Sequence, residues 1–322
     1  MLLSIIWLII SLVAILVGAN LLTDGSSAIA RRFGLSDLVV GLTVVAFGTS
    51  TPELVISIMA AVGGSAPLAV GNVVGSNIFN ILVIIGLTAL VMPIKIEKSI
   101  MVNEIPMVIL SSLILLVLGT QSFIDGGASN VVTRTLGIFL LIFFLLFMRY
   151  TLAQAHANPA APSGEKVPDK KPAMGKAILF VVLGLAGLVW GGDRFVDSAS
   201  QIAKILGVSD AVVGLTIVAA GTSLPELAAS IVAAVKKMSG LAVGNVIGSN
   251  IFNVLLVLGA SSVISPLPFG GVGVLDLSVL MLASVLFLLF GWFFKEREIT
   301  RVEGFLLFAC YVAYTVYLVM SI

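Results

Sequence analysis

The residues best suited to chemistry are two glutamates that close two copies of one short motif. Gly48–Glu53 reads GTSTPE and Gly221–Glu226 reads GTSLPE. Proline lacks a backbone N–H and breaks a helix, and Ser or Thr before Pro, followed by Glu, is typical of a new helix start. We therefore expect a helix break in each copy, with backbone carbonyls from about Ala46 to Thr49 and from Ala219 to Thr222 left without intrahelical partners.

A second motif, GNxxGSNxFN, also occurs twice and adds neutral oxygen atoms. Ser76 and Asn80 are four residues apart, so they share one helix face and can complete a coordination shell begun by a glutamate. The glycines of the motif permit close helix packing, and Asn77, one residue beyond Ser76, points elsewhere and is interpreted as structural. The polar residues of the two copies are Asn72, Ser76, Asn77 and Asn80, and Asn245, Ser249, Asn250 and Asn253.

Both motifs lie in long apolar runs that predict an all-α polytopic membrane protein. The chain is 59% hydrophobic and 10% charged, with mean hydropathy +1.21, whereas a soluble domain has roughly 25% charged residues. About 20 apolar residues cross the hydrocarbon core. The predicted transmembrane helices number ten: 2–30, 37–62, 67–92, 100–120, 132–152, 175–203, 210–235, 240–265, 274–294 and 302–321.

The two glutamates are placed near mid-depth of the second and seventh predicted spans. A glutamate that only caps its own helix is the structural alternative. An ionisable group near the bilayer centre is functional by default and needs a partner, and no basic residue lies at that depth in either copy. A bound cation is the simplest counter-charge. Carboxylate, hydroxyl, amide and carbonyl oxygens suit Ca²⁺ and Na⁺, and His156 is the single histidine.

The two motif pairs belong to an internal repeat with a shift of 173 residues. Gly18–Gly86 aligns with Gly191–Gly259 without a gap, and about 40 of 69 positions are identical. Five spans separate equivalent points, so the two copies must face opposite ways across the membrane. Charge agrees, because each copy has its basic pair, Arg31-Arg32 or Lys236-Lys237, in a different loop. Inverted five-helix repeats are a transporter signature.

A polar linker divides the chain nearly in half and predicts its orientation. The expected organisation is a first repeat at 1–152, a linker at 153–174 and a second repeat at 175–322. If the linker is cytoplasmic, every basic residue lies on that side except Arg134, Arg194 and Lys204, as the positive-inside rule requires. This places both termini outside in a multi-pass protein of the cell membrane.

Four aspartates in equivalent pairs are interpreted as structural. Asp24 and Asp197 lie near the ends of long first spans, which is typical of interfacial or packing residues. Asp37 and Asp210 each follow a serine and precede an apolar run, so they are expected to be helix N-caps.

On these motifs the sequence resembles the cation/calcium exchanger superfamily, and the prokaryotic sodium/calcium exchangers in particular, over essentially its whole length. The resemblance implies a Ca²⁺ site made of the Glu53 and Glu226 carboxylates with the Thr49 and Thr222 carbonyls. It implies flanking Na⁺ sites and a completed centre from the remaining ligands, which are Ala46, Ser50, Ser76 and Asn80, and Ala219, Ser223, Ser249 and Asn253. Some members, including potassium-dependent ones, have Asp at the position of Asn253, so its amide argues against K⁺ co-transport.

The expected function is an antiporter that exchanges Na⁺ for Ca²⁺ by alternating access, with no cofactor beyond the transported ions. A proton/calcium antiporter is the nearest alternative, since a midplane glutamate can alternate between a proton and a metal, and a channel is a third. An intramembrane enzyme is disfavoured because HExxH, GxSxG and GxGD motifs are absent. The expected partners are Na⁺, Ca²⁺ and the lipid bilayer, with no nucleic acid and no obligate protein partner.

Overall fold

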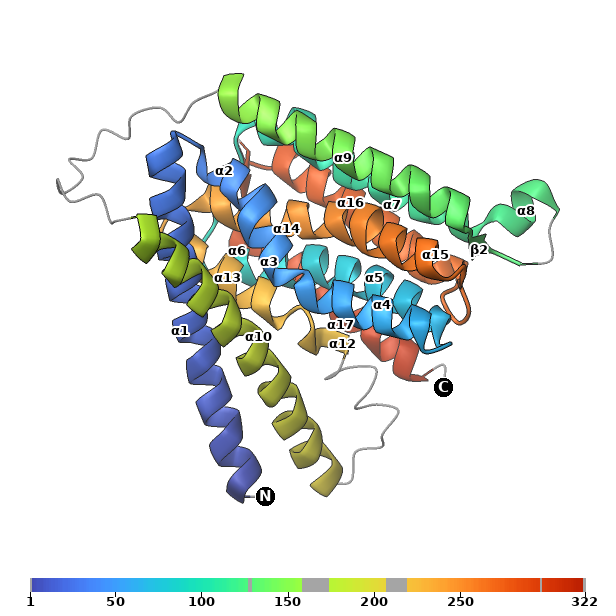
Figure 1. Ribbon diagram of the computed structural model, residues 1–322, viewed down its shortest axis with the longest axis horizontal. Coiled ribbons are helices and arrows are strands. Elements are labelled where there is room, and N and C mark those ends of the chain that lie inside the picture. Colours follow the sequence, from blue (N-terminus) through green and yellow to red (C-terminus); the bar gives the residue numbers. More distant parts are fainter. Residues whose placement is uncertain (1, 127–128, 158–173, 207–218, 296, 321–322) are drawn as a thin grey trace.

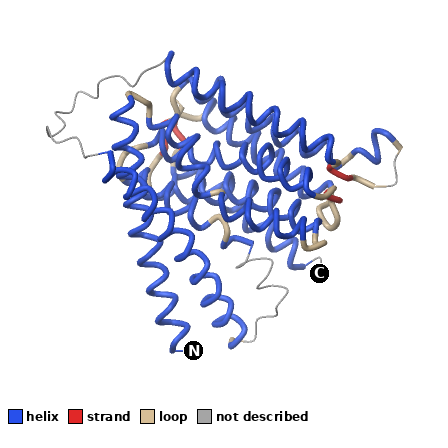
Figure 2. Tube along the Cα trace, viewed as in Figure 1, coloured by secondary structure: helices blue, strands red, loops and turns tan. Residues whose placement is uncertain are grey.

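Helices make up almost all of the chain, with two short strand pairs at opposite edges (Figures 1 and 2). The computed structural model describes residues 2–126, 129–157, 174–206, 219–295 and 297–320. The first half contains α1 (Leu2–Phe33), α2 (Asp37–Val40), η1 (Gly41–Val45), α3 (Ala46–Thr49), α4 (Thr51–Val62), α5 (Ala66–Phe79), η2 (Asn80–Ile85), α6 (Gly86–Val91), β1 (Ile94–Lys95), η3 (Ile100–Glu104), α7 (Ile105–Gly119), α8 (Gln121–Asp125), β2 (Val131–Val132) and α9 (Arg134–Ala157). The second half contains α10 (Met174–Ile205), α12 (Ala219–Gly221), α13 (Leu224–Val235), α14 (Ser239–Phe252), η5 (Asn253–Leu258), α15 (Gly259–Ile264), β3 (Leu267–Pro268), α16 (Val274–Phe293), β4 (Glu298–Ile299) and α17 (Arg301–Met320). The η elements are π-helical turns.

Eight helices in the described residues are long and apolar enough to cross a membrane, and a bent pair adds a ninth. The pair joins 37–49 to 51–62 across an angle of 44°, where the sequence predicted a break. Each of these nine agrees with a predicted span to within a few residues. The seventh predicted span, 210–235, is described only from Ala219, so its first half, with Asp210, lies outside the described residues.

Two spans form the interior of the bundle. The continuous helices at 66–91 and 239–264 are 83% and 94% buried over their most apolar stretches, whereas the helix at 301–320 is 17% buried. The outer helices expose large apolar side chains, such as Leu12 on α1 and Phe143 on α9. This distribution suits a molecule whose outer face contacts lipid and whose centre is closed to it.

Helices α1 and α10 lie side by side at one edge of the bundle (Figure 1) and pack through glycines. A Cβ on Gly184 would lie 2.5 Å from the Leu22 nitrogen, and one on Gly18 would lie 2.8 Å from the Gly184 carbonyl oxygen. Small residues let helix backbones approach in this way, as in many membrane helix pairs. The two first helices of the sequence repeats therefore pack directly against each other.

Contacts at the periphery cross between the halves of the chain in matched pairs. Strand β1 pairs antiparallel with β4, and β2 pairs with β3. Helix α6 packs on α17 and α15 packs on α9, with Gly86 against Gly304 in the first pair and Gly137 against Gly259 in the second. The peripheral helices and strands of each half of the chain therefore pack against those of the other half.

Alanine at Gly184 is expected to destabilise the protein, because its methyl group would overlap backbone atoms of α1, and overpacking costs about 1–3 kcal/mol. Gly175→Ala is the matched control on the same helix, since a Cβ there meets nothing within 4 Å and alanine favours a helix by about 1 kcal/mol over glycine. Thermal unfolding in detergent should give a lower midpoint for Gly184→Ala and an equal or higher midpoint for Gly175→Ala. Equal midpoints for the two variants would contradict the close α1–α10 contact.

Candidate functional site

The first glutamate motif forms a bend between α3 and α4. Ser50 lies at the junction with φ −83° and ψ 6°, and hydrogen bonding resumes with the Leu54 N–H donating to the Ser50 carbonyl at 3.1 Å. The expectation that the Ala46 carbonyl lacks an intrahelical partner is wrong, because the Ser50 N–H donates to it at 2.9 Å. Helical hydrogen bonding before the bend therefore extends to the Ser50 N–H.

The second motif has a similar bend, but its hydrogen bonding differs. The Ser223 N–H donates to the Ala220 carbonyl at 3.2 Å, so the expectation that this carbonyl lacks a partner is wrong. Ser223 precedes α13 with φ −93° and ψ 7°, and the Leu227 N–H donates to its carbonyl at 3.0 Å. Pro225 occupies the first turn of α13, as Pro52 does in α4. In both copies the glutamate follows this proline directly, so the bend determines where its side chain leaves the helix.

The two glutamates are buried and each contacts the other copy of the motif. Glu53 and Glu226 are both 1% exposed. Ser223 Oγ donates to Glu53 Oε1 at 3.3 Å, and Ser50 Oγ donates to Glu226 Oε1 at 3.1 Å. Within the described ranges no ion pair includes either glutamate, and the two carboxylates interact electrostatically with each other. Two negative charges thus meet in the interior with hydroxyl groups as partners.

Several buried oxygen atoms of the two duplicated motifs have no hydrogen-bond partner. Buried polar atoms in proteins are normally paired, so these unpaired oxygens need an explanation. They include the second oxygen of each carboxylate and atoms from both copies of the asparagine motif: Glu53 Oε2, Glu226 Oε2, Ser76 Oγ, Ser249 Oγ, Asn80 Oδ1, Asn253 Oδ1, Asn250 Oδ1 and Thr222 Oγ1. All but the Asn250 and Thr222 atoms were candidate ligand atoms from the sequence.

The helices that carry these atoms pack on one another at the centre. Helix α4 packs on α5 and on η5, and α13 packs on α14 and on η2. Asn80 and Asn253 are the first residues of the π-helical turns η2 and η5, and such turns are frequent at functional sites. Each glutamate helix therefore contacts both asparagine-bearing segments.

Two asparagines that were not assigned a role hold the glutamate helices in place. The Asn72 amide nitrogen donates to the Glu53 carbonyl at 3.3 Å and to Ser57 Oγ at 3.0 Å. The Asn245 amide nitrogen donates to the Glu226 carbonyl at 3.2 Å and to Ser230 Oγ at 3.0 Å. The sequence marked these two asparagines, since both lie at the same position of the repeated motif. It did not show their partners, which are backbone carbonyls and the equivalent serines of α4 and α13.

Other polar residues connect the two copies directly. Thr49 Oγ1 lies 3.1 Å from Asn245 Oδ1 and 3.1 Å from the Val45 carbonyl oxygen, and either oxygen can accept its single proton. The Asn77 amide nitrogen donates to the Asn250 carbonyl at 3.2 Å, and the Asn253 amide nitrogen donates to Asn77 Oδ1 at 3.0 Å. The structural interpretation of Asn77 agrees with this arrangement. The amide of Asn253 is oriented by the same bonds, which leave its own oxygen unpartnered.

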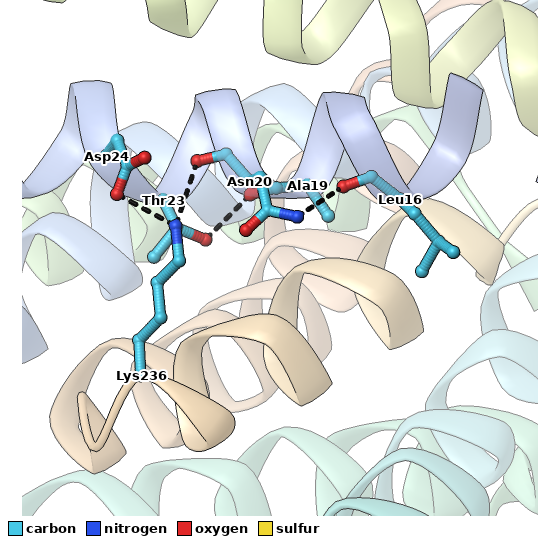
Figure 3. A network of polar contacts seen from close by, with 6 residues as sticks. All are labelled: Leu16, Ala19, Asn20, Thr23, Asp24 and Lys236. Atoms are coloured by element: carbon cyan, nitrogen blue, oxygen red, sulfur yellow. Dashed lines mark hydrogen bonds and ion pairs between the residues drawn. The ribbon is translucent and has the colours of Figure 1, made fainter. Parts of the chain in front are cut away.

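Asp24 and Asp197, two of the aspartates interpreted as structural, pair with basic residues. Lys236 reaches from the end of α13 to Asp24 Oδ1 on α1 at 2.8 Å and to the Asn20 carbonyl at 3.4 Å (Figure 3). Asp197 lies 3.8 Å from Arg194 on its own helix. The N-cap prediction for Asp37 is wrong by one residue, because Ser36 caps α2 by accepting from the Val39 N–H at 3.3 Å.

Asn245→Ala is expected to cost more stability than Asn72→Ala. Asn245 is 1% exposed and its side chain makes up to three hydrogen bonds, whereas Asn72 is only partly buried and makes two. Each bond contributes about 1 kcal/mol, and a buried partner left unpaired costs about 1–3 kcal/mol. Thermal unfolding midpoints of the two variants, measured together, test the order, and a larger loss for Asn72→Ala would contradict it.

Comparison with known proteins identifies the family of this site. The sodium/calcium exchanger protein family model matches residues 3–153 and 176–320. A putative antiporter CaxA from Alkalimonas amylolytica is 39% identical over 100% of both chains, and the sodium/calcium exchanger MaX1 from Methanosarcina acetivorans is 33% identical over 97% of both. A structure of the sodium-calcium exchanger NCX_Mj, soaked with zero Na⁺ and Ca²⁺, has a TM-score of 0.82 at 32% identity and covers 98% of this chain and 99% of its own. The chain is a membrane transporter rather than an enzyme, and it belongs to the sodium/calcium exchanger protein family.

Proposed function

We propose that this protein exchanges Na⁺ for Ca²⁺ across the membrane, with both ions bound in turn at the central glutamate pair. The observation that carries the proposal is the reciprocal arrangement of Glu53 with Ser223 and of Glu226 with Ser50. In it, one oxygen of each buried carboxylate accepts a hydrogen bond and the other has no partner. Membership of the exchanger family supports the same ions.

The chemistry of the donor set agrees with this cargo. Ca²⁺ takes 6–8 oxygen ligands, and two carboxylates supply the charge that one Ca²⁺ neutralises. Two or three Na⁺ ions could occupy the same region, but not together with Ca²⁺, because they would compete for ligands and repel one another. The proposed ligands are the Glu53 and Glu226 carboxylates, the Thr49, Thr222, Ala46 and Ala219 carbonyls, the Ser50, Ser223, Ser76 and Ser249 hydroxyls, and the Asn80 and Asn253 amide oxygens.

The Ala46 carbonyl can serve although it already accepts a hydrogen bond from Ser50, because a carbonyl oxygen has two lone pairs. Among the proposed ligands, Ser50 and Ser223 are the ones that donate to a carboxylate. A Na⁺ ion between a serine oxygen and the carboxylate would replace the contact that the serine proton makes. The hydroxyls therefore supply a neutral ligand when an ion is present and a hydrogen bond when it is not.

We further propose that transport proceeds by alternating access in a ten-helix protein built from two inverted five-helix repeats. Three observations support this arrangement: the sequence repeat, the odd number of spans between equivalent points, and the pairing of β1 with β4 and of β2 with β3 between the two halves. Helices α1 and α10 lack the ion-binding motifs and pack mainly on each other. They are the proposed sliding elements, moving across the core formed by the second, third, seventh and eighth spans.

The proposed membrane orientation has the central linker in the cytoplasm and both termini outside, in the cell membrane. It is supported by the distribution of Lys and Arg among the loops. The proposed organisation of the chain is a first repeat at 1–152, a linker at 153–174 and a second repeat at 175–322. Most of the linker, 158–173, lies outside the described residues.

Glu53→Gln and Glu226→Gln are each expected to reduce Ca²⁺ exchange to the background of empty vesicles. Glutamine keeps the volume of the side chain but removes half of the charge that balances Ca²⁺. The measurement is Ca²⁺ flux into proteoliposomes driven by an imposed Na⁺ gradient. Asp125→Asn, at an exposed carboxylate outside the bundle, should leave the flux unchanged, and wild-type flux in either glutamine variant would refute the site assignment.

Exchange of three Na⁺ for one Ca²⁺ would move one net charge per cycle, worth about 2.3 kcal/mol per 100 mV. We expect Na⁺-driven Ca²⁺ flux to respond to an imposed membrane potential. Leak without a counter-ion should be small, because an empty site leaves two uncompensated carboxylates near the bilayer centre, and this cost opposes the conformational switch. Voltage-insensitive flux would contradict this stoichiometry.

The same vesicles separate the competing functions. Flux that follows an imposed pH gradient instead of a Na⁺ gradient would favour a proton/calcium antiporter. Rapid Ca²⁺ flow with no counter-ion present would favour a channel. Glu53→Gln should abolish transport in all three cases, so the ion dependence of the wild-type protein is the deciding measurement.

A further inference from the structure

A third acidic residue, Glu104, is buried within a candidate membrane span but lies outside the central site. It ends the π-helical turn η3, and it is the fifth residue of the span at 100–119. Its side chain is 3% exposed. Tyr150 on α9 donates its hydroxyl hydrogen to Glu104 Oε1 at 3.4 Å, and Gln154 Nε2 donates to the Tyr150 oxygen at 2.8 Å. Glu104 Oε2 is buried and has no hydrogen-bond partner.

The equivalent residue in the other half has an ordinary structural role, which Glu104 lacks. Ser112 Oγ and Ser284 Oγ lie 2.7 Å apart. If these two serines are taken as equivalent, the halves are related here by a shift of 172 residues, and the same shift pairs Glu104 with Asp276. Asp276 Oδ2 accepts from the Gly273 N–H at 2.8 Å at the start of α16, and Oδ1 accepts from the Tyr314 hydroxyl at 2.7 Å. Both oxygens of Asp276 are thus satisfied. Glu104 makes no such cap, so helix capping explains the aspartate but not the glutamate.

Among the described residues, no basic side chain forms an ion pair with Glu104. Lys295 and Arg297, which line one pocket with Lys95 and Lys98, are exposed. Helix α7 has no charged residue, α16 has only the distant Asp276, and Arg149 on α9 is exposed. Lys95 and Lys98 precede the span but are exposed, and Glu97, also exposed, has the same sign as Glu104. A negative charge here would be costly.

The donor set is too small for a metal ion. Ca²⁺ needs 6–8 oxygens. In the part of the chain that the structure describes, the side chains hydrogen-bonded to the Glu104 carboxyl are Tyr150 and, through it, Gln154. A proton needs one oxygen and removes the charge. The unpartnered Oε2 supplies that oxygen, while Oε1 keeps its bond from Tyr150.

We propose that Glu104 is a proton-binding site, separate from the ion-exchange site, that takes up and releases one proton. The carboxylate takes the proton from water onto Oε2 and becomes a neutral carboxyl group. Tyr150 and Gln154 are positioning residues, because the chain of two hydrogen bonds holds Oε1 and leaves Oε2 for the proton. Gln154 lies near the end of α9 and is only half-buried, which places the chain between Glu104 and the surface at which that helix ends.

Infrared spectroscopy of the full-length protein in lipid tests this site without reference to transport. A protonated carboxyl group has a C=O stretching band that an ionised one lacks. The wild-type minus Glu104→Gln difference spectrum should contain this band, and its intensity should grow to that of one carboxyl group as the pH is lowered through about 7. The wild-type minus Asp276→Asn difference is the control, because both oxygens of Asp276 accept hydrogen bonds. Absence of the band from the Glu104→Gln difference would overturn the proposal.

A second variant keeps the proposal testable if Glu104→Gln does not fold. Tyr150→Phe removes the hydroxyl group that donates to Oε1, and loss of this bond raises the frequency of the carboxyl C=O stretch. We expect the band to persist and to move upward in Tyr150→Phe, whereas Phe144→Leu, on the same helix outside this chain, should leave it in place. A band that is unmoved by Tyr150→Phe would show that the protonated group is not Glu104. Neither measurement depends on which ions the central site exchanges, so failure of the exchanger proposal would leave this result intact.

Discussion

The burial of two carboxylates without a counter-charge is the constraint on which the rest of the structure depends. Glu53 and Glu226 are each 1% exposed and are close enough to interact electrostatically. Charge of one sign in a low-dielectric interior is tolerated only when an opposite charge or oriented dipoles compensate it. The serine hydroxyls provide part of this compensation, and a transported cation is the natural source of the remainder. Transport and the stability of the centre are therefore two aspects of one electrostatic requirement.

The duplicated motifs meet this requirement through contacts between the halves rather than within them. Ser50 serves Glu226, Ser223 serves Glu53, and Thr49 contacts Asn245. Each glutamate takes its serine partner from the other half, so a movement of one half relative to the other would change the partners of both glutamates together. In the proposed exchange, this coupling would keep the site from changing its exposure while its charge is uncompensated.

The asparagine motif orients the glutamate helices without using the glutamate carboxylates. Asn72 and Asn245 bond to backbone carbonyls of α4 and α13, so the side-chain oxygens of the glutamates are left for ions. The π-helical turns that begin at Asn80 and Asn253 keep these two residues at the centre. The close packing expected of Gly71 and Gly75 is not seen among the described residues, where a Cβ on Gly71 would meet only Val272 at 4.0 Å and one on Gly75 would meet nothing within 4 Å. Their equivalents Gly244 and Gly248 do lie against Leu38 and Leu42. The regions equivalent to those partners, 211 and 215, lie outside the described residues.

The sequence by itself determined the helical membrane class and the bend at Pro52, because hydropathy and proline chemistry are local properties. It also determined which oxygen atoms could act as ligands, since the repeat marks them twice. Only the tertiary structure decided that each serine bonds to the glutamate of the other half, that Lys236 pairs with Asp24, and that Asn72 and Asn245 act on backbone carbonyls. These are contacts between residues distant in sequence, and their geometry depends on how the helices pack. Glu104 illustrates the same limit: its residue type is visible in the sequence, but its burial and its missing partner are properties of the packed bundle.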